Sequence, residues 1–284
     1  MSLPIWVRGL LVATIAGASA LVSTNALALA ETLWLSPDRA NPPVINVDRQ
    51  GNFIRQAPFF GASGVAVYPE GNALYTAGPA TSFSRFDLDT LAPAGSLTLT
   101  PLVPQFGEDL AYDGTFLYRA DYSGQRIIRF DPTTGASTLF KQFTGNDAGG
   151  PVGLAWTGTG FYVSMYNQGR ILELDVTGNV LRSFTVQSGQ MSLYGGLGWD
   201  VVDNSLWIGT VGRVFEIDES NGVVLGGFVL PAPYGTGTFV DGLEFQNAAT
   251  PTGNNVPEPG TLALVGLALV GLKLKGLRRR RQAD

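Results

Sequence analysis

The sequence predicts an all-β fold built from repeated four-stranded antiparallel units, and three observations support this prediction. Short runs of alternating apolar residues are separated by turn signals that contain glycine. A pattern of apolar-x-apolar-Asp occurs five times, with intervals of 41, 42, 44 and 43 residues between its Asp residues. Each Asp is followed within three to six residues by a glycine. A period in the forties with four strands per unit is typical of propeller blades, so we expect a five-bladed β-propeller.

The clearest repeat covers Gly107–Phe143, where four apolar runs are separated by Asp-Gly, Ser-Gly and Pro-Thr-Thr-Gly turns. The same arrangement recurs at Val152–Phe184 and Gly196–Phe228, and more loosely at Gly64–Leu97. The Asp of the pattern can open the turn through its side chain, and the glycine accepts a positive φ. We therefore interpret the five aspartates as turn residues and not as a metal-binding ring. They are Asp48, Asp89, Asp131, Asp175 and Asp218.

The two ends of the repeat region predict how the ring closes. The first repeat has only three strands, at Leu33–Leu35, Val44–Asp48 and Phe53–Phe59, and the last is the lone inner strand Asp241–Phe245. One strand from the C-terminal side and three from the N-terminal side would complete a fifth blade and remove the open edge. We predict a propeller over residues 31–247, with a four-bladed ring or an open array as the alternative.

Three segments of one repeat, Pro151–Ala155 (PVGLA), Phe161–Val163 (FYV) and Gly169–Ile171 (GRI), carry a family resemblance, and Tyr118–Ile127 is a second match. They resemble the strands of the NHL-like and gluconolactonase-like propellers. The resemblance covers residues 33–246 and implies a scaffold, a ligand binder or a lactonase. Gluconolactonase-like propellers hold a divalent metal with Glu, Asp and Asn side chains, but that set has no residue-by-residue match here.

Composition excludes several kinds of chemistry. The 284 residues include no cysteine and no histidine, so disulfides, Ser-His-Asp and Cys-His triads, His-ligated zinc and His-ligated haem are all excluded. Residues 31–255 carry 11 basic and 21 acidic side chains, a net charge of −10. Such a domain repels phosphate backbones, so we expect no nucleic-acid partner.

The N-terminal segment Met1–Ala30 predicts export. One positive residue, Arg8, precedes the apolar run Gly9–Val22, and small residues lead to Ala28-Leu29-Ala30. This order is typical of a signal peptide, which we expect the export translocon to recognise and signal peptidase to cut after Ala30. An uncleaved N-terminal anchor is the alternative.

The C-terminal tail has three parts after a small polar linker at residues 248–255. A Pro-rich break is followed by an apolar segment at about 260–277, long enough for a short transmembrane helix, and then by an arginine cluster at 278–281. The positive-inside rule places the arginines in the cytoplasm and the propeller outside.

This tail resembles the PEP-CTERM sorting signal of Gram-negative bacteria. The matching residues are Val256, Pro257, Glu258, Pro259, Arg278, Arg279, Arg280 and Arg281. The resemblance implies recognition by exosortase, an integral-membrane transpeptidase, which would remove the tail near Pro-Glu-Pro. The domain would then reach the cell surface or the exopolysaccharide matrix, where exopolysaccharide or surface proteins are the expected partners. A permanent single-pass anchor, and with it a periplasm-facing membrane-anchored scaffold, is the alternative.

A ligand site on the propeller would lie at the channel mouth, where the inner strands begin. Four carboxylates fall near these starts and could hold Ca²⁺ through oxygen ligands: Glu108, Asp109, Asp241 and Glu244. Solvated rim carboxylates are the alternative. The longer loop Leu230–Phe239, with Tyr234, is a candidate binding loop. We expect no catalytic residues and no required cofactor, and a metal-dependent lactonase-like hydrolase is the alternative function.

Overall fold

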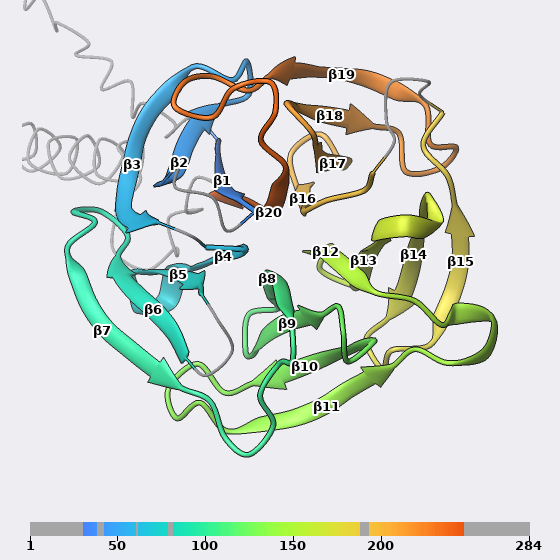
Figure 1. Cartoon of the computed structure of the whole chain (residues 1–284), viewed down its shortest axis with the longest axis horizontal. Coiled ribbons are helices and arrows are strands. Elements are labelled where there is room, and N and C mark those ends of the chain that lie inside the picture. The colour runs from blue at the N-terminus through green and yellow to red at the C-terminus, as the bar shows by residue number, and fades with distance from the viewer. Residues whose placement is uncertain (1–30, 39–42, 61, 79–81, 188–192, 247–284) are drawn as a thin grey trace, which may run out of the picture.

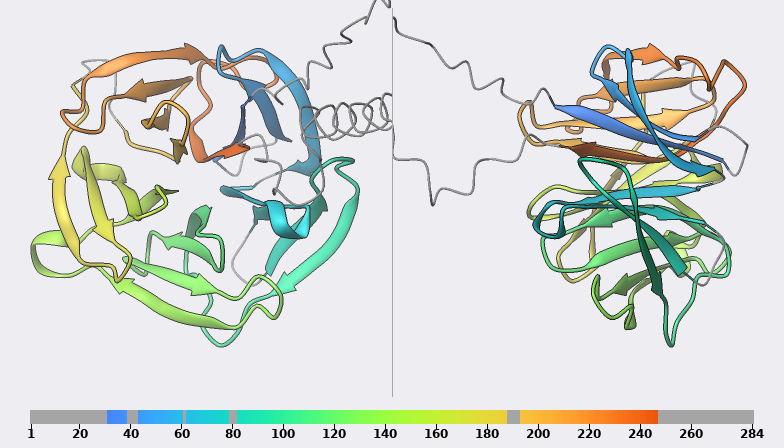
Figure 2. Two further views of the ribbon diagram at one scale, coloured as in Figure 1. Left: turned by 180° about the vertical axis from the view of Figure 1, so that it is seen from behind. Right: turned by 90° about the vertical axis from the view of Figure 1, so that its left-hand side faces the viewer.

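The computed structural model describes residues 31–38, 43–60, 62–78, 82–187 and 193–246. Within these ranges, twenty β-strands form five four-stranded antiparallel sheets that stand around a central axis (Figure 1). Figure 2 shows the same ring from behind and from the side. The chain is an all-β five-bladed propeller, as its repeats predict.

Four of the blades are made of strands that follow one another in the chain, with the first strand innermost. They are β4 (Gly64–Tyr68), β5 (Ala73–Ala77), β6 (Ser82–Asp87) and β7 (Pro93–Thr98); β8 (Gly107–Tyr112), β9 (Leu117–Asp121), β10 (Arg126–Phe130) and β11 (Ser137–Gln142); β12 (Pro151–Trp156), β13 (Gly160–Met165), β14 (Arg170–Asp175) and β15 (Val180–Phe184); and β16 (Leu197–Asp200), β17 (Ser205–Thr210), β18 (Arg213–Ile217) and β19 (Val224–Val229). Three single-turn 3₁₀ helices, η1 (Pro69–Gly71), η2 (Gly145–Asp147) and η3 (Tyr166–Gln168), lie between strands.

The fifth blade joins the two ends of the propeller. Its strand order is β20-β1-β2-β3, with β1 (Thr32–Pro37), β2 (Pro43–Asp48), β3 (Phe53–Phe60) and β20 (Val240–Gln246). Leu33 pairs with Phe245 and Leu35 with Leu243, so β1 and β20 are antiparallel neighbours. The composite blade predicted from the incomplete end repeats is therefore confirmed.

The core consists of five apolar clusters, and each one lies between two neighbouring blades. Phe83 of β6 and Phe130 of β10, for example, meet edge to face with ring centroids 5.1 Å apart. Both faces of a blade therefore pack against neighbours, which explains the many aromatic residues. Each large apolar side chain buried in this way stabilises the fold by about 1.5–3 kcal/mol.

The turn after β6 corrects one prediction. In the other four repeats, the predicted Asp accepts backbone N–H bonds within its turn. In the second repeat this residue is Asp87 and not Asp89, because the Asp87 carboxylate accepts N–H bonds from Asp89 and Thr90 at 3.1 and 2.8 Å. The residue with positive φ in that turn is Leu91, at 58°. Leu88 is apolar and buried, so the pattern apolar-x-apolar-Asp fits Phe86–Asp89 and predicts an aspartate two positions too late.

Several predictions concern residues outside the described ranges. They are the signal peptide (1–30), the linker (248–255) and the C-terminal tail with its transmembrane helix (256–281). In the part of the chain that the structure describes, no helix has the length and apolar character needed to cross a membrane.

Candidate functional site

Five equivalent residues, one from the start of each inner strand, meet near the axis of the propeller. Four are glycines and one is an aspartate: Gly64, Asp109, Gly153, Gly196 and Gly242. The backbones are so close that a Cβ atom at Gly153 would lie 2.2 Å from the carbonyl oxygen of Gly195. A Cβ atom at Gly242 would lie 2.8 Å from the Cα of Gly64 and 2.9 Å from Oδ1 of Asp109. The glycines thus leave the space at the axis that the Asp109 carboxylate occupies.

Asp109 ties three blades together from this position. Its Oδ1 accepts the N–H of Leu110 at 2.8 Å, and its Oδ2 accepts the N–H groups of Leu154 and Leu197 at 3.2 and 3.1 Å. Those three donors lie on or at the start of β8, β12 and β16. Burial raises the pKa of Asp109 well above its usual range, and the three backbone hydrogen bonds oppose this shift. Asp109 therefore acts as a structural tie between blades.

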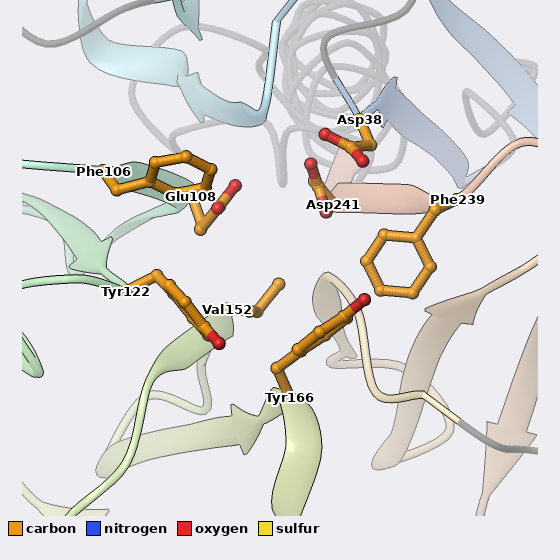
Figure 3. Close-up of a pocket in the computed structure, with 8 residues that line it drawn as sticks. All are labelled: Asp38, Phe106, Glu108, Tyr122, Val152, Tyr166, Phe239 and Asp241. Carbon is orange, nitrogen blue, oxygen red and sulfur yellow. The ribbon is translucent and has the colours of Figure 1, made fainter.

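A pocket of about 180 Å³ opens at the mouth of the propeller, next to this axial ring (Figure 3). Three of its lining residues, Glu108, Val152 and Asp241, directly precede members of the ring on β8, β12 and β20. The described residues that line the pocket are Asp38, Phe106, Glu108, Tyr122, Val152, Tyr166, Phe239 and Asp241. The pocket thus draws on residues from the composite blade and from the blades of β8–β11 and β12–β15.

Four aromatic rings form a continuous arc along one side of the pocket (Figure 3). Ring centroids are 5.9 Å apart for Phe106 and Tyr122, 5.9 Å for Tyr122 and Tyr166, and 5.6 Å for Tyr166 and Phe239. The backbone holds the ends of this arc, since the Tyr122 N–H donates to the Phe106 carbonyl at 2.8 Å and the Asp38 N–H donates to the Phe239 carbonyl at 3.0 Å. These bonds fix the backbone at both ends of the arc, and the ring contacts connect the side chains between them.

Three carboxylates, from Asp38, Glu108 and Asp241, lie on the other side of the pocket (Figure 3). Asp38 is exposed, whereas Glu108 and Asp241 are only 4% and 3% exposed. The described residues of the lining include no lysine or arginine. Burial raises the pKa of the Tyr166 hydroxyl, and the charges of Asp241 and Asp38 raise it further. The pocket therefore combines negative charge with aromatic surface.

The structure separates the four carboxylates predicted from the sequence. Glu108 and Asp241 line the pocket, and Asp109 lies in the axial ring. Glu244 lies three residues beyond Asp241 on β20, opposite Trp34 of β1, and burial raises its pKa. Among the described residues, no group of three or more acidic side chains is arranged to hold a metal ion.

The predicted binding loop contributes a different residue from the one expected. Tyr234 is buried, and its hydroxyl donates a hydrogen bond to the Leu35 carbonyl at 2.6 Å, so it fixes the loop to β1. Phe239, at the end of the same loop, lines the pocket.

The sequence analysis does not single out six of the eight described lining residues, although two repeated patterns could have found four of them. An aromatic residue stands two positions before a carboxylate in Phe106-x-Glu108 and again in Phe239-x-Asp241. Tyr122 and Tyr166 both directly follow the second strand of their blades. The other two, Asp38 and Val152, belong to neither pattern.

Comparison with known families gives two matches. The family described as “Repeat of unknown function (DUF6923)” matches residues 55–225, and the PEP-CTERM protein-sorting motif matches residues 255–281. The resemblance of the tail to a PEP-CTERM signal is thereby confirmed. No curated protein matches the chain.

Solved structures show similarity in fold alone. A protein of unknown function from Bacteroides caccae has a TM-score of 0.52 at 10% identity, covering 76% of this chain and 98% of that one. A chain of a nidogen/laminin complex has a TM-score of 0.50 at 14% identity, with the same coverage of 76% and 98%. Glutaminyl cyclase from Myxococcus xanthus has a TM-score of 0.48 at 14% identity, covering 70% of this chain and 74% of that one, which is too distant to carry an argument.

Proposed function

The chain belongs to the family described as “Repeat of unknown function (DUF6923)”. Because that description names no activity, we propose a function from the sorting motif and the fold. The PEP-CTERM motif implies an exported protein with exosortase as its processing partner. We infer that the released propeller acts at the cell surface or in the exopolysaccharide matrix as a non-enzymatic interaction module.

The observation that carries this proposal is the position of the motif. The motif begins at residue 255, and the last strand, β20, ends nine residues earlier at Gln246. All twenty strands and all five core clusters lie within residues 31–246, so the complete ring precedes the tail. Removal of the tail would leave the closed propeller intact.

The test is the intact mass of the protein recovered from membrane and medium fractions of a Gram-negative host that has exosortase. We expect a released species that begins at Glu31 and ends near Pro257–Gly260. Glu258→Ala should keep the tail and hold the protein in the membrane, whereas Thr250→Ala in the linker should be processed normally. The sorting proposal would be overturned if all of the recovered wild-type protein still carried Arg278–Arg281.

The alternative from the other functional class is a metal-dependent lactonase-like hydrolase. It requires a bound metal near the pocket carboxylates, with oxygen ligands as calcium prefers. Residues 31–255 can be tested with calcium and simple lactones. Under our proposal, calcium leaves the thermal midpoint unchanged and lactone hydrolysis equals the background rate, whereas a calcium-dependent hydrolysis that Glu108→Gln abolishes would favour the enzyme.

A further inference from the structure

Removal of the predicted signal peptide would create a new charged group beside a cluster of acidic side chains. We propose that the α-ammonium of Glu31, formed when the chain is cut after Ala30, binds in this cluster and strengthens the junction at which the ring closes. The inference rests on the proposed function, because it gives the processed N-terminus of the exported protein a role in the fold.

The ion-pair cluster lies between the composite blade and the blade of β16–β19. It places one arginine, Arg49, among four acids: Glu31, Asp200, Asp203 and Glu216. Asp200 is fully buried, and its Oδ1 accepts the N–H groups of Val202 and Asp203 at 2.9 and 3.2 Å. Its Oδ2 lies 2.5 Å from Nη2 of Arg49. The acids of the cluster therefore outnumber the arginine that pairs with them.

The carboxyl groups of Glu31 and Asp200 face each other inside the cluster. Their side chains are in hydrogen-bonding contact, and ionised carboxylates are acceptors only, so this contact requires a proton on one of them. Without that proton, the buried Oε1 of Glu31 has no donor in the described part of the chain, and Oδ2 of Asp200 has only its ion pair with Arg49. Two ionised carboxylates at this distance repel each other. The cluster therefore offers acceptors to a further positively charged donor.

The backbone places the α-nitrogen of Glu31 beside these acceptors. The next residue, Thr32, begins β1 and pairs with Asp48 of β2 on one side and with Gln246 of β20 on the other. Arg49 directly follows Asp48, so Glu31 and Arg49 extend side by side from the paired strands. The pairing on both sides fixes the position from which the α-nitrogen meets the cluster.

Cleavage changes the chemistry of this nitrogen. In the precursor it belongs to a peptide bond and carries one N–H and no charge. Hydrolysis of the Ala30–Glu31 bond consumes one water: Ala30 takes the oxygen as its new carboxylate, and the amine of Glu31 takes up a proton. The resulting ammonium has a positive charge and three donors, as a lysine side chain has. It therefore supplies what the facing carboxylates lack in the precursor.

The site makes the firmness of ring closure depend on processing. The composite blade closes the ring by pairing β1 with β20, and the cluster joins that blade to its neighbour. The ammonium exists only once signal peptidase has cut the exported chain. The processed protein is therefore closed more firmly than its precursor.

The first experiment compares two proteins that have the same formal charge and differ in where the ammonium stands. One covers residues 31–255 and the other residues 25–255, which adds only uncharged residues (NALALA). Each is released from a fusion so that no other residue precedes it. We expect the thermal midpoint of the protein that begins at Glu31 to be about 3 °C higher at pH 7.

The pH dependence of this difference identifies the ammonium as its cause. An α-amino group has an ordinary pKa of about 8, and contact with the acids raises that pKa in the folded state. A raised pKa gives a contribution to stability that is complete below about pH 8 and is lost as the pH rises through the folded value. The difference in midpoint should therefore disappear by about pH 10.5.

The second experiment removes a partner of the ammonium and repeats the same comparison. Asp200→Asn keeps an acceptor oxygen for the two N–H groups but removes the charge, and it should reduce the difference to less than about 1 °C. Asp203→Asn, at a half-exposed position, should reduce it by a smaller amount. Asp147→Asn in η2, outside the cluster, should leave it at about 3 °C. Because each difference is taken within one variant, a general loss of stability cancels.

Three results would overturn the proposal: equal midpoints at pH 7, a difference that persists unchanged at pH 10.5, or the same difference in Asp200→Asn as in the unchanged protein. Protein from the host that begins elsewhere than at Glu31 would also overturn it, because no ammonium would form at this position. The midpoints are measured on purified protein without the tail, so failure here is distinct from failure of tail processing, which is measured by mass in the host.

Discussion

Two groups of carboxylates in this propeller have different surroundings, and the comparison shows which of them hold neighbouring blades together. The pocket cluster consists of Asp38, Glu108 and Asp241 and faces aromatic rings. The ion-pair cluster consists of Glu31, Asp200, Asp203 and Glu216 around Arg49. The acidic residues around Arg49 join two blades, whereas those of the pocket cluster lie beside aromatic rings at the mouth of the propeller.

The ion-pair cluster connects the composite blade to the blade of β16–β19. Arg49 follows β2 and lies 2.5 Å from carboxylate oxygens of Asp200, the last residue of β16, and of Asp203 in the turn before β17. It lies 3.7 Å from Glu216 of β18, and its guanidinium stands over the Trp207 ring at 5.7 Å. A single arginine thus joins two blades next to the closure of the ring.

The largest expected effect on the free energy of unfolding concerns Asp109. This residue belongs to neither cluster and serves as the reference for a purely structural carboxylate. Asp109→Ala removes the acceptor of three buried N–H groups on three strands. Each N–H left unsatisfied costs about 1–3 kcal/mol, so we expect a loss of about 4 kcal/mol in the free energy of unfolding. Urea unfolding of residues 31–255 measures it.

A matched comparison makes this prediction specific. Glu108→Gln changes the neighbouring residue of the same strand but keeps its shape and an acceptor oxygen, so we expect it to destabilise the protein less than Asp109→Ala does. Equal destabilisation by the two variants would mean that the pocket carboxylate is also structural, and the contrast between the regions would be lost.

The next largest effect is expected in the ion-pair cluster. Arg49→Ala leaves the buried Asp200 carboxylate beside two other acids without its cation, and breaking such a pair costs about 3 kcal/mol. The measurement is again urea unfolding, with the exposed Arg213→Ala as the control, which should change stability by less than about 0.5 kcal/mol. If both arginine variants are equally stable, the cluster does not hold the blades together.

The smallest effect concerns pH. Burial and the neighbouring Asp200 raise the pKa of Glu31 from 4.5 to about 7. A raised pKa means that the folded state holds the proton more tightly than the unfolded state. Its contribution to stability is therefore complete below pH 4.5 and is lost as the pH rises towards about 7.

The test is the difference in stability between the unchanged protein and Glu31→Gln across this pH window, in protein that retains residues 25–30. The variant should gain in relative stability as the pH rises. In protein that begins at Glu31, the new α-ammonium should favour the ionised carboxylate and shrink this difference. A difference that does not vary with pH in the longer protein would contradict the prediction.

Much of the fold was predictable because its signals are local. The alternating runs, the turn residues and the incomplete end repeats predict the five blades and the composite closure. The exception at Asp87 has a local cause, since Leu88 continues the apolar pattern beyond the end of β6 and shifts the alignment by two residues.

The site was predictable only in part. The inner strand starts predict Glu108 and Asp241 as site residues, but Asp109 and Glu244 lie at comparable sequence positions and do not line the pocket. In a strand, neighbouring side chains point in opposite directions, and their contacts depend on the adjacent blade. The position of a carboxylate along the strand therefore does not decide whether it lines the pocket or accepts backbone N–H groups.

The sequence by itself determined the repeat and the sorting motif, because each of these depends on residues that are close together in the chain. It also predicted the closure of the ring, because the two end repeats are incomplete, although the strands that pair there lie at opposite ends of the propeller. The tertiary structure alone decided the pocket and the axial tie. The pocket unites residues from Asp38 to Asp241, and Asp109 accepts hydrogen bonds from Leu154 and Leu197. Such contacts arise only when closure of the ring brings the inner strands of separate blades together at one axis.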